Sequence, residues 1–307
     1  MTRLFLYYFL ALVLKCCVSE DWCYQSQMSC EQPCKGPVVW NEVNESCGGN
    51  RQSPINIVSK KTVQSSSLTE FRFTGYNEIF TSRLKNTGQT VSLDIPLGAS
   101  VSGGNLSQTY NAVQLQFHWG NSGSPGSEHT IDGEQYPMEL HIVHIKDTYI
   151  SVEEALSDPK GQASLGFFFE ESETENKEYS AFIEALAQVQ DAESQADVLI
   201  SLNNLILQQS KLKAYYRYEG SQTTPGCSES VIWTVFMQPI PLSKDQLAVF
   251  SSLKFKDGNP MVDNFRPVQP RKGRVVYRSN SGTTVAMINF TLVWLCVSTA
   301  LSSYQIY

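Results

Sequence analysis

The chain has 307 residues, of which 41% are hydrophobic and 17% are charged. This composition is typical of a globular protein with a sizeable core, and it excludes a largely disordered chain. The formal net charge of −7 argues against a nucleic-acid partner, whose phosphates it would repel. The length allows one large domain or two modest ones.

The chain begins with the features of a secretory signal peptide. Arg3 precedes an apolar run from Leu4 to Leu14, and small residues follow up to Ser19. We therefore expect cleavage near Ser19, which would remove residues 1–19. A retained membrane anchor is the alternative, but the apolar run is too short to span a bilayer and Lys15 interrupts it.

The segment from Trp22 to Cys47 is rich in cysteine, proline and glycine, which predicts an N-terminal lead held by disulfides. An oxidising compartment favours such bonds, although spacing alone does not fix their connectivity. Asn44 and Asn105 each begin an Asn-x-Ser glycosylation acceptor, as expected of a secreted surface. Between the predicted signal peptide and the apolar segment at the C-terminus, the cysteines are Cys23, Cys30, Cys34, Cys47 and Cys227.

The middle of the chain reads mainly as strands. Short alternating runs between Phe71 and Asp94 are separated by turn residues, and the apolar run Ala163 to Phe169 suits a buried strand. The absence of a βαβ rhythm in the sequence favours a single α+β domain over residues 20–278, mainly β, with a mixed, mostly antiparallel sheet and short peripheral helices. Further strands are predicted at Tyr215 to Tyr218 and Val231 to Phe236, and helices at Tyr179 to Gln190, Val198 to Leu207 and Lys244 to Leu253.

Two other alternating segments, 114–120 and 139–144, carry the most informative polar residues. Side chains two residues apart on a strand share a face. If the two segments pair, two imidazoles and one amide converge in a small space. One face of the first segment carries Gln114, Gln116 and His118, and one face of the second carries Glu139, His141 and Val143.

The C-terminus has the features of a signal for attachment of a glycosylphosphatidylinositol (GPI) anchor. Small residues from Ser279 to Gly282 precede an apolar tail from Val285 to Leu301, and no Lys or Arg follows Arg278. A spanning helix usually has basic residues on its cytoplasmic side. We therefore predict that residues 279–307 are a GPI signal with attachment near Ser279, with a single membrane span as the alternative.

The two polar segments resemble those of α-type carbonic anhydrases, with the membrane-anchored type-four enzymes as the closest group. The family pattern is Gln-x-His-x-His-Trp-Gly followed by Glu-x-His-x-Val-His, and Arg51 to Ile57 matches another family signature. The resemblance extends from Trp22 to about Arg278. It implies a large twisted sheet with a conical cleft, a zinc cofactor, and reversible hydration of carbon dioxide to bicarbonate. It also implies the pairs Cys23–Cys34 and Cys47–Cys227, which leaves Cys30 without an account.

The sequence departs from the family pattern at the metal site. His118 and His141 match two of the zinc ligands, but the first ligand histidine is here Gln116. Carbonic anhydrases are the standard example of a catalytic zinc held by three histidines. Gln116 either ligates weakly through its neutral amide oxygen, or hydrogen-bonds His118 or His141 in a metal-free pocket. Gln114 and Glu139 match the residues that orient the ligands.

Other residues match the catalytic and substrate positions of the family. By resemblance, Thr223 is the catalytic threonine, and Glu128 accepts the proton of its hydroxyl group. The proton-shuttle position holds Gln89 instead of histidine, so no imidazole is expected near the cleft mouth. Two polar residues in a dry pocket would recruit water or each other in place of a nonpolar gas. The substrate pocket is expected to contain Val143, Ser164, Gln222, Thr224, Val231 and Trp233, of which Ser164 and Gln222 are those polar replacements.

These observations leave two main hypotheses. The first is a GPI-anchored carbonic anhydrase on the extracellular face of the plasma membrane, with hydration impaired by Gln116. The second is a catalytically silent cell-surface binding protein on the same fold, whose partner the sequence does not name. Weak hydrolysis of small esters at residual zinc is a lesser alternative. The replacements at Gln89, Ser164 and Gln222 favour reduced or absent activity because they affect proton export and substrate packing separately.

Overall fold

The computed structural model describes residues 22–28 and 34–280. The predicted signal peptide, Cys30 and the apolar C-terminal tail lie outside these residues. Within the described ranges, no helix is both long enough and apolar enough to cross a membrane.

Residues 22–28 and 34–280 contain fifteen strands and a few short helices. The helices are α2 (Val152–Ala155), α3 (Ser180–Leu186), α4 (Leu202–Leu205) and α5 (Lys244–Phe250), with 3-10 turns η1 (Gln25–Gln27), η2 (Pro37–Glu42), η3 (Glu45–Gly48), η4 (Ser59–Lys61), η5 (Lys177–Tyr179) and η6 (Gln209–Lys211). The strands are β1 (Asn56–Ile57), β2 (Val63–Gln64), β3 (Phe71–Thr74), β4 (Phe80–Asn86), β5 (Val91–Asp94), β6 (Ser100–Gly103), β7 (Tyr110–Trp119), β8 (Thr130–Ile131), β9 (Glu134–Gln135), β10 (Met138–Lys146), β11 (Gln162–Ser172), β12 (Gln195–Ile200), β13 (Tyr215–Gly220), β14 (Val231–Ser243) and β15 (Tyr277–Arg278).

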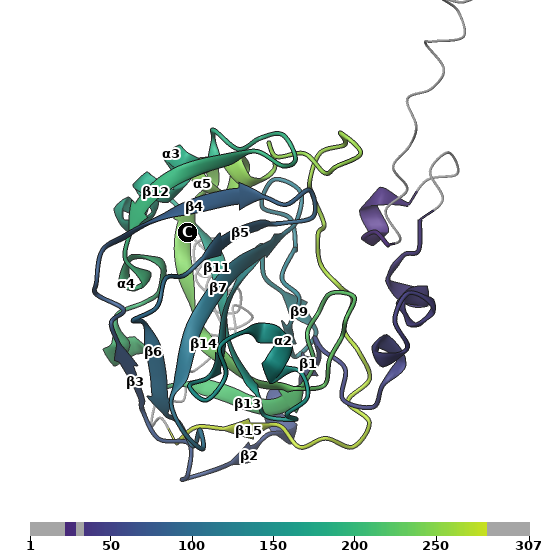
Figure 1. The fold of residues 1–307 in the computed structure, drawn as a ribbon, viewed down its shortest axis with the longest axis vertical. Helices are drawn as coiled ribbons and strands as arrows, with labels where there is room; N and C mark the ends of the chain where they lie inside the picture. The colour runs from purple at the N-terminus through teal and green to yellow at the C-terminus, as the bar shows by residue number, and fades with distance from the viewer. Residues whose placement is uncertain (1–21, 29–33, 281–307) are drawn as a thin grey trace, which may run out of the picture.

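A twelve-stranded sheet dominates the molecule, with the order β12-β4-β5-β7-β10-β11-β14-β13-β15-β2 and with β3 and β6 attached beside β7. Most neighbours are antiparallel, whereas β11–β14 and β15–β2 are parallel. Helices α3 and α5 lie at the end of the sheet that holds β4 and β12, and β13, β15 and β2 lie at the other end (Figure 1). The predicted class, a mainly β domain with a mixed sheet, is confirmed.

The apolar residues of β7 and β10 face the hydrophobic core, which explains why the polar residues of both strands lie together on the opposite face of the sheet. Leu115 and Phe117 on β7, and Leu140 and Ile142 on β10, are fully buried in one hydrophobic cluster. Burying each such side chain contributes roughly 1.5–3 kcal/mol. Because strand side chains alternate, this burial fixes the register and turns the intervening polar residues to the opposite side.

One helix prediction is wrong. Residues 195–200, including Val198 and Ile200, form β12 and pair with β4, and only the four-residue helix α4 follows. Val198 and Ile200 are buried while Leu199 is exposed, which is the period of a strand. The pairing partner lies far away in the sequence, so local spacing favoured the wrong element. The helices predicted near α3 and α5 are present but shorter.

Two disulfides hold the N-terminal lead, and they join the pairs that the resemblance implied. Cys23 is bonded to Cys34, and Cys47 is bonded to Cys227 across 180 residues. The second bond ties the lead to the loop that follows Thr223. Trp40 is fully buried at the base of the lead, with its indole N–H shared between two backbone carbonyls.

Candidate metal centre

The centre is built on the antiparallel pair β7 and β10, as the alternation predicts. His141 lies opposite Gln116 in the register, and Glu139 lies opposite His118. The rings of His118 and His141 are 4.8 Å apart, centroid to centroid. Gly166 on β11 faces His141, where an added Cβ would lie only 3.0 Å from Oε1 of Glu139. The glycine therefore leaves room for the carboxylate beside the ring.

His118 is held in one tautomer. Its Nδ1 donates to the backbone carbonyl of Asn264 at 2.8 Å, which leaves the lone pair on Nε2. The side-chain oxygen of Asn264 accepts from the backbone N–H of Trp119 at 2.7 Å, which fixes Asn264 itself. Burial lowers the pKa of His118 and favours the neutral ring. A neutral imidazole with a free Nε2 is a competent metal ligand.

His141 is held by Glu139, which is fully buried. Oε1 of Glu139 accepts from Nε2 of His141 at 2.8 Å and from Nδ1 of His129 at 2.7 Å. Its Oε2 accepts the backbone N–H groups of Glu128 and His129 at 2.9 and 2.8 Å. Burial alone would raise the pKa of Glu139, but His129 and His141 hold it well below its ordinary value. The lone pair of His141 is thus left on Nδ1.

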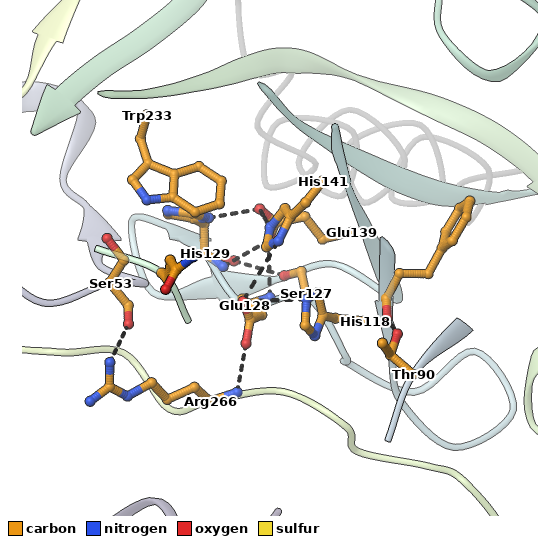
Figure 2. A network of polar contacts seen from close by, with 12 residues as sticks. Ser53, Thr90, His118, Ser127, Glu128, His129, Glu139, His141, Trp233 and Arg266 are labelled. Carbon is orange, nitrogen blue, oxygen red and sulfur yellow. Dashed lines mark hydrogen bonds and ion pairs between the residues drawn. The ribbon is translucent and has the colours of Figure 1, made fainter. Parts of the chain in front are cut away.

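The contacts continue away from the rings. Nε2 of His129 accepts from the hydroxyl of Tyr218 at 2.6 Å, and that hydroxyl lies 2.8 Å from Oγ of Ser53. We call Ser53, Tyr218, His129 and Glu139 the support network. Figure 2 shows His129 and Glu139 beside His141, with Trp233 above them. Sequence reasoning left His129 in a loop and missed Ser53, Tyr218 and Asn264, which come from distant parts of the chain.

The expected hydrogen bond between Glu128 and Thr223 is not formed. Oε1 of Glu128 accepts the backbone N–H of Arg266 at 2.8 Å, and Oε2 lies 3.6 Å from Nε2 of His118. Oε2 of Glu128 and Oγ1 of Thr223 are both buried without a hydrogen-bond partner among the described residues. The backbone N–H of Arg266 holds one oxygen of the Glu128 carboxylate (Figure 2), and the other oxygen lies beside the imidazole of His118.

Among the described residues, the buried polar atoms without a hydrogen-bond partner include one ring nitrogen from each of the two histidines, His118 and His141. Nε2 of His118 and Nδ1 of His141 have no hydrogen-bond partner in the described part of the chain, so Gln116 bonds to neither ring. Oε2 of Glu128 lies 3.6 and 3.9 Å from these two nitrogens. Two imidazoles fixed in the metal-binding tautomer fit a zinc ion. His118, Glu128 and His141 form one group that could hold a metal, and His129, Glu139 and His141 form another.

The space in front of His141 is a small polar cavity, which we call the site cavity. It has a volume of about 110 Å³. Nε2 of Gln222 donates to Oε1 of Gln162 at 3.4 Å, and Gln162 in turn donates to Ser230 at 2.8 Å. The expected polar wall is present, but Gln162, which sequence reasoning missed, joins it. The lining residues are Gln114, Gln116, His141, Val143, Val152, Gln162, Ser164, Gln222, Thr223, Thr224 and Trp233.

Several predicted residues lie outside the site cavity. Val231 is buried on β14 without lining it, and Gln89 lies in the turn before β5, where its carbonyl accepts from Asn264. The glycosylation candidates Asn44 and Asn105 are exposed. Ser279 is buried, and its backbone N–H donates to the carbonyl of Tyr215 at 3.0 Å.

The large mixed sheet is the fold class that the resemblance implied, and comparison with known proteins identifies the family. Residues 35–280 match the eukaryotic-type carbonic anhydrase family. The chain is 39% identical to Carbonic anhydrase 4 of Rattus norvegicus over 281 residues, 89% of each protein. It is 35% identical to Carbonic anhydrase 15 of Mus musculus over 300 residues, 91% of each. It is 38% identical to Carbonic anhydrase 7 of Homo sapiens over 252 residues, 80% of this chain and 94% of that protein.

The chain therefore belongs to the eukaryotic-type carbonic anhydrase family.

Proposed function

We propose that the protein is an extracellular, GPI-anchored carbonic-anhydrase-like protein whose hydration of carbon dioxide is impaired at the metal site. One observation carries the proposal. Nε2 of His118 and Nδ1 of His141 are set for a metal, but the residue opposite His141 in the register is Gln116. The third corner of the site therefore offers an amide in place of an imidazole.

The residues present would hold zinc through His118 and His141, with Gln116 as a weak third donor. Zinc, when bound, supplies Lewis-acid polarisation of oxygen and lowers the pKa of water. Asn264 and Glu139 keep the two rings in their ligating tautomers, which raises the basicity of the ligand nitrogens. An amide oxygen is a harder donor than imidazole, so Gln116 should hold zinc less well than histidine would.

The remainder of the site also favours a slow reaction. Hydration turns carbon dioxide and water into bicarbonate and a proton, so each turnover must export one proton. Gln89 has no group that titrates near neutral pH and cannot carry that proton as histidine would. In the site cavity, Gln222 and Gln162 present amides where carbon dioxide needs a dry, apolar wall.

Stopped-flow hydration measured with added zinc tests this function. The unmodified protein should show little hydration, and Gln116→His should raise the rate. Adding Gln89→His should raise it again, mainly in weak buffer, because the new imidazole relieves proton export. Gln108→His on the protein surface is the matched control and should change nothing. Fast hydration by the unmodified protein would overturn the proposed impairment.

A silent cell-surface binding protein is the second candidate. The support network supports it, because the four groups pair with one another and need no metal to stay ordered. This candidate predicts that Gln116→His gains zinc while the unmodified protein neither binds zinc nor hydrates carbon dioxide under any buffer condition. Measurable hydration by the unmodified protein that follows its zinc content would exclude it.

The anchor is part of the proposal. Ser279 is tied to β13 through its backbone N–H, and its hydroxyl donates to the carbonyl of Lys213 at 2.7 Å. Attachment through the carboxyl group of Ser279 would place the lipid anchor close to the end of the sheet. Phosphatidylinositol-specific phospholipase C should release the protein from cells. Retention after treatment, with the tail still present by mass spectrometry, would indicate a spanning helix.

A further inference from the structure

A second cavity lies on the other face of β14, one of the strands that line the site cavity. It has a volume of about 580 Å³, which is the size of a site for a small organic ligand. On β14, Trp233 lines the site cavity and its neighbour Ile232 lines the second one. The strands β13 and β15 border it, together with the residues that follow β2, and these strands lie together at one end of the sheet (Figure 1). The sheet therefore separates the two cavities.

The second cavity is basic, although the chain as a whole is acidic. Its lining contains four cationic side chains and one carboxylate, that of Glu219. The formal charge of the lining is therefore +3. The complete chain carries −7. A concave surface of one sign focuses its field and raises the local concentration of small ions of opposite charge. The four cations are Arg51, Lys160, Arg217 and Arg274.

Arg217 is the central feature of this basic cavity. It is only 7% exposed, and its hydrogen bonds go to neutral oxygens, namely Oγ1 of Thr234 from Nε and Nη2 and the carbonyl of Gly104 from Nη1. No carboxylate among the described residues lies within salt-bridge distance of it. Burial lowers its pKa to about 10, so it remains charged at neutral pH. A buried charge without a counter-ion is costly unless a ligand supplies one.

The other cations are only partly neutralised. Arg274 donates to backbone carbonyls, including that of Glu219 at 3.1 Å. The carboxylate of Glu219 lies 2.9 Å from Nζ of Lys160 and 3.4 Å from Nη1 of Arg51. Glu219 thus serves Lys160 and Arg51 at the rim, and Arg51 has a second carboxylate in Glu229, 3.7 Å from its Nε. Arg217 and Arg274 have no carboxylate from the cavity wall. Glu219 competes for the cations that an incoming anion would use.

We propose that this basic cavity binds a small organic oxyanion, with its carboxylate or sulfate group directed at Arg217 and a sugar-sized polar body against the rim. The guanidinium matches the geometry of such groups. The rim suits a polyhydroxylated body because it presents the hydroxyls of Ser65, Ser67 and Ser107 and the aromatic ring of Tyr277. The cavity is much larger than one inorganic sulfate needs, which favours a sugar acid or a sulfated sugar.

Titration calorimetry with three probes tests the ligand class. Glucuronate and N-acetylglucosamine 6-sulfate should bind at millimolar concentrations or below, inorganic sulfate should bind more weakly, and neutral N-acetylglucosamine should not bind. The measurement is repeated on Asn105→Gln, because Asn105 lines the cavity and a glycan there would stand at its edge. Binding of the neutral sugar as tightly as the acidic ones would overturn the proposal.

Two rim variants of opposite sign locate the site. Lys160→Gln should weaken binding about fivefold, and Glu219→Gln should tighten it because Lys160 loses its carboxylate partner. Lys254→Gln is the matched control: Lys254 is also about half exposed and pairs with Asp191 at 2.7 Å, away from the cavity wall. Arg217→Met should abolish binding. The urea denaturation midpoint of this variant shows whether the variant protein is folded.

The proposed binding site would be refuted if probe affinity did not change in Lys160→Gln and Glu219→Gln. It would also be refuted if Lys254→Gln changed the affinity equally. Gln116→His should leave probe binding unchanged, because Gln116 lies across the sheet. The result is therefore independent of whether the protein binds zinc or hydrates carbon dioxide.

Discussion

The support network and the site cavity lie on two sides of His141 and differ in how their polar groups are satisfied. In the support network, each carboxylate oxygen of Glu139 accepts two hydrogen bonds, and His129 is bonded at both ring nitrogens. In the site cavity, the hydroxyl of Thr223 has no partner among the described residues, and the side-chain amide of Gln222 donates to that of Gln162 at 3.4 Å. The groups that hold the rings are in place, whereas those that would face a substrate have changed. Support and reactivity are therefore separable in this fold.

The largest expected effect comes from removing the disulfide between Cys47 and Cys227, which ties the N-terminal lead to the loop beside both regions. Cys47 and Cys227 are 180 positions apart in the sequence, and the backbone carbonyls of both accept hydrogen bonds from buried side chains, those of Arg266 and Gln52. Chain entropy alone predicts that Cys47→Ser with Cys227→Ser lowers the free energy of unfolding by about 5 kcal/mol. Urea denaturation measures this value. The variant with Cys23→Ser and Cys34→Ser, whose loop is much shorter, should lose less.

The next effect concerns the carboxylate at the centre of the support network. Glu139→Gln removes a buried charge that accepts from two imidazoles and two backbone N–H groups, so it should cost about 4 kcal/mol in unfolding free energy. It should also weaken zinc binding in a Gln116→His background, because His141 loses its orienting partner. Glu134→Gln, at an exposed position on β9, is the control. Equal stability of the two variants would show that the network is not structural.

A pH effect is expected from His144, on the core side of β10. Its Nε2 lies 2.7 Å from the hydroxyl of Tyr76, and burial lowers its pKa from 6.5 to about 4. As the pH falls, His144 is protonated in the unfolded chain before it is protonated in the folded one. The folded state therefore has its full stability from His144 above pH 6.5 and loses it as the pH falls towards 4. The loss should be about 3 kcal/mol. His144→Gln should lack this slope in urea denaturation measured across that range.

The smallest effect is expected in the site cavity. Gln222→Leu removes only the weak contact with Gln162, so the free energy of unfolding should change by less than about 1 kcal/mol. The same variant should make the cavity drier and raise hydration in the Gln116→His background. A loss comparable to that of Glu139→Gln would mean that the cavity amides are structural, and it would end the distinction between the two regions.

The sequence predicts the strands of the site better than the contacts between them. Alternation along β7 and β10 predicts which side chains share a face, because apolar residues such as Leu115 and Leu140 must be buried. It does not predict that Asn264 holds His118, or that Ser53 reaches the hydroxyl of Tyr218, because those partners lie more than a hundred residues apart. The expected bond from Thr223 to Glu128 fails for the same reason, since the backbone of Arg266 holds the carboxylate.

The zinc content of the purified mature protein tests the central claim most directly. After dialysis against a mild chelator, the unmodified protein should hold clearly less than one zinc ion per chain, and Gln116→His should hold about one, because His118 and His141 are already oriented. Stoichiometric zinc in the unmodified protein would show that Gln116 is a competent ligand and would contradict the account.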